Sequence, residues 1–137
     1  MEILVDSNVI LDIVTEDPKW FQWSSETLAS YVGSHIVVIN PIIYAEVSIG
    51  FERIEEVENV LPTLYFRRAQ LPWEAAFLAG KCFLKYRRKG VKRHSPLPDF
   101  FIGAHATVMG MALMTRDVSQ YKAYFPKLRL ISPKKSV

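Results

Sequence analysis

Three short, continuous runs of apolar residues place the strongest constraint on the fold of this chain. They occupy residues 3–5 ("ILV"), 35–39 ("HIVVI") and 112–115 ("ALMT"). Strands that are buried on both faces have this pattern, because helices cover both faces of a parallel sheet. Apolar residues at helical spacing follow each run. The alternation predicts an α/β protein, a three-layer α/β/α sandwich with a mostly parallel central sheet.

The same spacing predicts the positions of the remaining elements. Helices are expected over residues 8–14, 21–32, 41–49, 53–61, 73–88, 99–109 and 117–125, and further strands over residues 64–67 and 128–132. Gly33, Gly90 and Gly110 provide helix ends, and the Asn40-Pro41 pair provides a helix start. With 137 residues and no repeat or linker, the chain is expected to form a single domain over residues 1–137.

The composition indicates the cellular compartment in which the protein works. The single cysteine, Cys82, cannot form an internal disulfide, which favours a reducing environment. No basic segment precedes an apolar stretch at the N-terminus, and Asn40, Pro41 and Glu46 interrupt the longest apolar region. We therefore expect a cytoplasmic protein that does not associate with a membrane.

The formal net charge is only +3, but the charges are unevenly distributed. Thirteen of the 17 Lys and Arg residues and only two of the 14 acidic residues follow residue 74. A basic half suits a polyanionic partner such as RNA, although basic residues also favour the C-terminal end of any helix. Both interpretations remain open for the candidate RNA-contacting residues, which are Lys85, Arg87, Arg88, Lys89, Lys92, Arg93 and Arg116.

Four acidic residues occupy positions that an ordinary surface does not explain. Asp6 and Asp117 follow predicted strands, Glu46 lies on the apolar stripe of its helix, and Asp99 lies in the first turn of another. Helix capping or the helix dipole would explain each aspartate alone, whereas a glutamate on a core face needs a partner. The other acids are expected at the solvated surface; they are Glu2, Asp12, Glu16, Asp17, Glu26, Glu52, Glu55, Glu56, Glu58 and Glu74.

Together the four acids predict a metal site, because ligands of parallel sheets bind beyond the carboxyl ends of the strands. Two carboxylates about 5 Å apart repel each other by roughly 3 kcal/mol at an effective dielectric constant near 20. Oxygen ligands without a suitable Cys or His set favour Mg²⁺ or Mn²⁺, which can activate water for phosphodiester hydrolysis. A phosphatase with an aspartyl-phosphate intermediate is an alternative, but its usual D-x-D pattern is absent because Asn8 occupies the second position.

Four blocks of the sequence resemble the PIN-domain family, and in particular the VapC-type toxin ribonucleases of type II toxin–antitoxin systems. The blocks are "ILVDSNVILD", "NPIIYAEV", "LPDFFIGAHA" and "LMTRDVSQYKAYFPKLRLISP", and they occur in order over essentially the whole chain. The resemblance implies a Mg²⁺- or Mn²⁺-dependent endoribonuclease in which Asp6, Glu46, Asp99 and Asp117 are catalytic and hold metal. It also implies that Ser7, Asn8 and Thr115 support these acids.

The resemblance further implies partners. Members of this family usually form homodimers and are silenced by a VapB-type antitoxin that lies along the active-site groove. Two alternatives within the same fold stay open. One is a PIN-domain RNA-processing nuclease outside a toxin–antitoxin pair, and the other is a non-catalytic module that binds RNA or protein.

Overall fold

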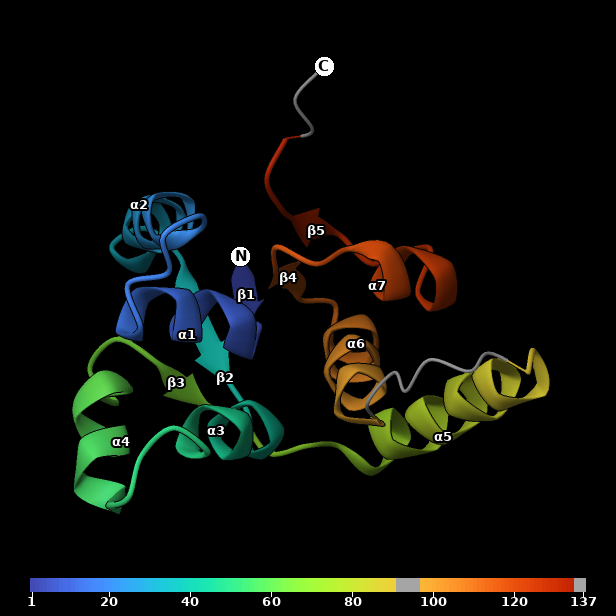
Figure 1. Ribbon diagram of the computed structural model, residues 1–137. Coiled ribbons are helices and arrows are strands. Elements are labelled where there is room, and N and C mark those ends of the chain that lie inside the picture. Colours follow the sequence, from blue (N-terminus) through green and yellow to red (C-terminus); the bar gives the residue numbers. More distant parts are fainter. Residues whose placement is uncertain (91–96, 135–137) are drawn as a thin grey trace.

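A five-stranded parallel sheet forms the centre of the computed structural model, which describes residues 1–90 and 97–134 (Figure 1). The strand order is β3-β2-β1-β4-β5, and every pair of neighbouring strands is parallel. The strands are β1 (Glu2–Val5), β2 (Ile36–Ile39), β3 (Arg67–Arg68), β4 (Ala112–Met114) and β5 (Leu130–Ile131). The N-terminal strand therefore lies in the middle of the sheet.

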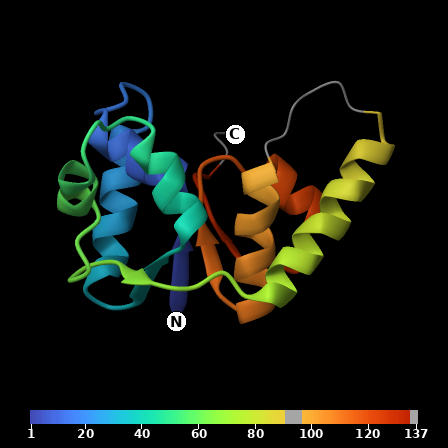
Figure 2. The same cartoon turned by 90° about the horizontal axis from the view of Figure 1, so that it is seen from below.

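Helices cover both faces of this sheet. They are α1 (Ser7–Val14), α2 (Phe21–Val32), α3 (Pro41–Ser48), α4 (Ile54–Val60), α5 (Trp73–Arg88), α6 (Leu97–Met109) and α7 (Ser119–Tyr124). Helices α1 and α2 lie on one side of the sheet and α5, α6 and α7 on the other (Figures 1 and 2). The predicted three-layer α/β/α architecture is confirmed.

The apolar runs are strands for the predicted reason. Ile3, Leu4 and Val5 are fully buried, as are most residues of β2 and β4, so helices cover both sides of these strands. The strand predicted over residues 64–67 is wrong in its position. A turn in which Tyr65 and Phe66 bond to the Pro62 carbonyl occupies that segment, and pairing with β2 begins at Arg67.

Helix α3 joins the two helical layers at the carboxyl edge of the sheet. It follows β2 directly, Asn40 caps it by accepting a hydrogen bond from the Ile43 amide (2.9 Å), and it packs against α1, α4 and α6. Asn40 also bonds to the buried His105 ring of α6, at 3.0 Å. Because of this placement, side chains of α3 can reach the ends of the central strands.

The single cysteine, Cys82, is a free thiol that is buried in α5. Within residues 1–90 and 97–134, no helix combines the length and apolar character needed to cross a membrane.

Gly103→Ala is expected to destabilise the protein by about 2 kcal/mol, although the same change stabilises most helices. A methyl group at position 103 of α6 would overlap the ring of Phe125, which is 4% exposed and has little room to move. Urea denaturation measures the change. Gly80→Ala in α5 is the matched control, because no atom lies within 4 Å of its added Cβ apart from its chain neighbours and the adjacent backbone of its own helix. It should stabilise the protein by up to about 1 kcal/mol, and equal effects of the two changes would contradict this packing.

Candidate active site

Asp6 and Thr115 are the residues that follow two adjacent strands, β1 and β4, and they lie next to each other. Val5 of β1 pairs with Met114 of β4, and the Asp6 amide donates to the Met114 carbonyl at 2.9 Å. Asp6 and Thr115 therefore both lie at the carboxyl edge of the sheet. Asp6 is the N-cap of α1, as the sequence predicts, and its Oδ1 accepts a hydrogen bond from the Ser7 amide at 2.8 Å.

The other oxygen of Asp6 accepts hydrogen bonds from three side chains. Its Oδ2 lies 2.9 Å from Thr115 Oγ1, 2.8 Å from the Tyr121 hydroxyl and 3.4 Å from Asn8 Nδ2. Asn8 Nδ2 also donates to Thr115 Oγ1 at 3.0 Å. These donors come from α1, from the residue that follows β4 and from α7. They hold the 3% exposed Asp6 carboxylate in one orientation.

The pKa of Asp6 reflects two opposing influences. Burial raises it above the ordinary value, because removal from water disfavours the ionised form. Hydrogen bonds from Tyr121, Thr115 and the Ser7 amide favour the carboxylate and counteract part of this rise. A cation close to this carboxylate would also favour the ionised form.

Glu46 reaches the same edge from α3. Its Oε1 accepts a hydrogen bond from Ser7 Oγ at 2.9 Å, so Ser7 links the α1 N-terminus to this half-buried carboxyl group. Burial raises the pKa of Glu46, and the charge of Asp6 raises it further. The prediction that Glu46 lies on the inner face of its helix therefore agrees with its surroundings.

Asp99 lies in the first turn of α6, and the pKa of its carboxyl group is well above the ordinary value. Burial and then the negative charges of Asp6, Glu46 and Asp117 raise its pKa from 3.8 to about 7. An acid is affected in this way only by charges close to it. The four predicted acids, from four separate segments, therefore act on one another electrostatically.

Asp117 is the exposed member of this group. Its amide donates to Thr115 Oγ1 at 3.2 Å, and its Oδ1 accepts from Ser119 Oγ at 3.3 Å. The alternative in which Asp117 caps the last helix is wrong, because α7 begins at Ser119 and its N-cap is Val118. The Asp117 carboxylate is therefore not committed to a helix end.

The donor set suits a hard divalent cation, but the carboxylates have not converged. Within residues 1–90 and 97–134, no three acidic, His or Cys side chains are arranged to hold one metal ion. Burial and, to a smaller extent, the charges of neighbouring acids raise the pKa values of Asp6, Glu46 and Asp99. A bound cation would offset both the cost of burying these carboxylates and their mutual repulsion, so the residues present fit Mg²⁺ or Mn²⁺.

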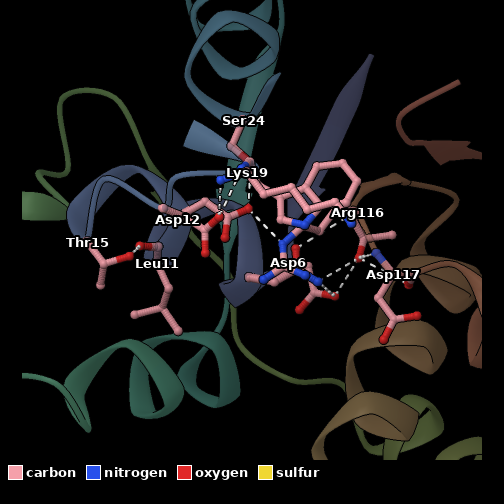
Figure 3. A network of polar contacts seen from close by, with 12 residues as sticks. Asp6, Leu11, Asp12, Thr15, Lys19, Ser24, Arg116 and Asp117 are labelled. Atoms are coloured by element: carbon pink, nitrogen blue, oxygen red, sulfur yellow. Dashed lines mark hydrogen bonds and ion pairs between the residues drawn. The ribbon is translucent and has the colours of Figure 1, made fainter. Parts of the chain in front are cut away.

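A second polar network lies beside Asp6 (Figure 3). The sequence predicts a solvated Asp12, and this is wrong, because the Asp12 side chain is 3% exposed. Its Oδ2 accepts hydrogen bonds from Ser24 Oγ and from Arg116 Nε, both at 2.8 Å. Arg116, a candidate RNA contact from the sequence, thus has its Nε bound to a buried carboxylate, while 31% of its side chain remains exposed.

Four of the other candidate RNA-contacting residues lie at the C-terminal end of α5. Lys85, Arg87, Arg88 and Lys89 are all exposed there. This end of α5 and the first turn of α6 lie toward the same end of the molecule (Figure 2). Lys92 and Arg93 lie outside the described residues.

Tyr121 is a site residue that sequence reasoning missed. It is 3% exposed, and burial together with the charge of Asp6 raises its pKa well above the ordinary value, so it is a hydrogen-bond donor at neutral pH. Both Tyr121 and Tyr124 fit the apolar spacing of the last helix. In the helix that the sequence predicts over residues 117–125, Tyr121 lies one turn after Asp117, and this spacing is the signal that could have singled it out.

Comparison with known families identifies the class of protein. The PIN domain family matches residues 3–126, so this chain belongs to the PIN domain family. No curated protein matches the chain significantly.

Solved structures share the fold over nearly the whole chain. A chain of the VapBC2 complex of Rickettsia felis, bound to a promoter DNA fragment, has a TM-score of 0.71 and 19% identity, covering 98% of this chain and 100% of its own length. A chain of VapBC-1 from nontypeable Haemophilus influenzae has a TM-score of 0.71 and 20% identity, covering 96% of this chain and 98% of its own length. VapC20 of Mycobacterium tuberculosis, described as a Sarcin-Ricin loop cleaving toxin, has a TM-score of 0.66 and 13% identity, covering 93% of this chain and 98% of its own length. At these identities the likeness establishes the fold.

Proposed function

We propose that this protein is a Mg²⁺- or Mn²⁺-dependent endoribonuclease and the toxin of a VapBC-type toxin–antitoxin pair. The observation that carries the proposal is the surroundings of Asp99, where burial raises the pKa of its carboxyl group most and the nearby charges of Asp6, Glu46 and Asp117 raise it further. Membership of the PIN domain family and the fold shared with VapBC complexes support it.

The side chains of the site would divide the work as follows. Asp6, Asp99 and Asp117 would hold the cation, and Glu46 would either bind it or orient the attacking water. Thr115 and Asn8 fix the Asp6 carboxylate, and Ser7 fixes that of Glu46. When bound, the cation would supply charge that activates water and stabilises the phosphate oxygens during hydrolysis. The basic residues at the end of α5 would attract the RNA backbone.

Cleavage of RNA by the purified protein tests the proposal. We expect cleavage with Mn²⁺ or Mg²⁺, none with a chelator, and recovery when excess Mn²⁺ is restored. RNA binding without cleavage under every metal condition would instead favour the non-catalytic module. Cleavage without growth arrest on expression would favour an RNA-processing nuclease.

An antitoxin is the proposed regulatory partner, and an apolar surface between α1 and α2 supports it. Two cavities of about 370 and 430 Å³ share Ile13, Leu28 and Phe66 as lining residues. An amphipathic helix of a VapB-type protein would bury its apolar face in such a groove. The proposed site of action of the pair is the cytoplasm.

A homodimer is the proposed assembly, and exposed apolar residues of α5 support it. Trp73 is 89% exposed, Phe77 is 69% exposed and lies one turn further along, and Leu84 follows on the same side. Isolated exposed apolar residues are common, but three along one helix favour a covered surface. Light scattering should give a dimer for the wild type and a monomer for the variant in which Trp73 and Phe77 are both serine.

A further inference from the structure

The buried pair of Asp12 and Arg116 links three segments of the chain next to the acidic site. Asp12 belongs to α1, Ser24 belongs to α2, and Arg116 belongs to the segment after β4 (Figure 3). Both donors bond to the same oxygen, Asp12 Oδ2, at 2.8 Å. A buried carboxylate is costly without a charged partner, so the position of Arg116 is tied to that of Asp12.

The guanidinium group of Arg116 is also held by an aromatic ring. Its Cζ lies 5.5 Å from the centroid of the Trp20 ring, an arrangement that favours a cation over the indole face. Trp20 is fixed in turn by Asp17, whose Oδ1 accepts hydrogen bonds from the Lys19 and Trp20 amides, both at 2.9 Å. The side chain of Arg116 is thus held by the Asp12 carboxylate and by the Trp20 ring, and a hydrogen bond from the Trp20 amide to Asp17 fixes the backbone of Trp20.

The two neighbours of Arg116 in the chain both belong to the acidic site. Thr115 donates to Asp6 and accepts from the Asp117 amide, and the Arg116 amide donates to Asn8 Oδ1 at 3.4 Å. A shift of the Arg116 side chain would therefore move the backbone that carries Thr115 and Asp117. Asp117 is exposed, and its recorded hydrogen bonds are to Thr115 and Ser119, both close to it in the sequence.

We propose that Asp12 and Arg116 are positioning residues that hold Thr115 and Asp117 in the arrangement needed to bind the divalent cation. The inference rests on the proposed metal-dependent nuclease function and deepens it. In this arrangement the buried pair acts through the backbone of residues 115–117. The principal role of Arg116 is then to support the metal site, and contact with RNA phosphate is the competing role.

The variants Asp12→Asn and Arg116→Met test the pair, since each removes one charge while keeping most of the side-chain shape. Three quantities are measured: Mn²⁺ affinity by calorimetry without RNA, amide hydrogen exchange of residues 115–118, and kcat and KM for RNA cleavage. We expect both variants to bind Mn²⁺ about tenfold more weakly, to exchange faster in this segment, and to lose kcat with KM nearly unchanged. The double variant should bind Mn²⁺ no more weakly than either single variant, because the two residues act as a pair.

Lys122→Met is the matched control, because Lys122 is an exposed cation of α7 and is not part of the network. Arg116→Lys should recover part of the Mn²⁺ affinity that Arg116→Met loses. If Asp12→Asn does not fold, Ser24→Ala removes the other donor to Asp12 and should weaken Mn²⁺ binding in the same direction.

The proposal fails if Arg116→Met raises KM while Mn²⁺ affinity and hydrogen exchange stay at wild-type values, which would show a phosphate contact. It fails equally if Asp12→Asn binds Mn²⁺ like the wild type. Failure of the underlying function is distinguishable, because the wild type itself would then neither bind Mn²⁺ nor cleave RNA.

Discussion

Asp6→Asn is expected to lower cation-dependent RNA cleavage by at least about a thousandfold while leaving the protein folded. Asparagine has the shape of aspartate and caps helices as well, so α1 should keep its first turn. It has no charge to bind a cation. If its carbonyl oxygen keeps the hydrogen bond from the Ser7 amide, its NH2 group takes the place of Oδ2 and cannot accept from Thr115 and Tyr121. The site would then lose both a proposed metal ligand and its most ordered carboxylate.

Initial rates at saturating Mn²⁺ measure this loss, and circular dichroism with thermal melting checks the fold. Glu52→Gln is the matched control, since it also removes one negative charge but from an exposed residue outside the site. It should cleave at the wild-type rate. Undiminished cleavage by Asp6→Asn would overturn the assignment of the active site.

Asp99→Asn is expected to stabilise the metal-free protein at pH 8 by about 2 kcal/mol and to abolish its stabilisation by Mn²⁺. The pKa of Asp99 rises from 3.8 to about 7 on folding, so between these values the folded protein holds a proton that the unfolded chain has released. Stability therefore falls as pH rises through this window. At about 1.4 kcal/mol per unit of pKa change, the ionised Asp99 carboxylate would lower the free energy of unfolding by at most about 4 kcal/mol. Asp99 is partly exposed, which reduces this destabilisation by about half.

Urea denaturation with a chelator, at several pH values from 4 to 8, measures this effect. The variant and the wild type should differ least near pH 4 and most at pH 8. Saturating Mn²⁺ should then reverse their order, because only the wild type gains a cation that binds the folded state. Identical pH dependence of the two proteins would contradict the electrostatic coupling of the four acids.

The sequence predicts the central strands and the architecture well, because that information is local. Residues 3–5 can be assigned to a buried strand from their own side chains, and the same holds for residues 112–114. The carboxyl-edge rule then brings Asp6 and Asp117 toward one side without knowledge of any contact. The sequence does not predict the position of β3, because its two arginines are exposed and only pairing with β2 defines it as a strand.

The parts of the site that could not be predicted depend on distant partners. Asp12 has the composition of a surface residue, and only Arg116, 104 positions away, explains its burial. Tyr121 resembles any core tyrosine until Asp6, 115 positions away, is placed beside its hydroxyl. Side-chain charge and local spacing cannot predict such pairs, because they arise from the order of strands in the sheet.

That strand order has a consequence for the protein during its synthesis. Strand β1 emerges from the ribosome first, but one of its two neighbours, β4, emerges among the last elements. Two of the hydrogen bonds to Asp6 come from Thr115 and Tyr121, so a nascent chain lacks these donors until residues 109 and 115 positions after Asp6 have been made. The acidic site therefore stays incomplete during synthesis until β4 and α7 have been made and have folded against β1.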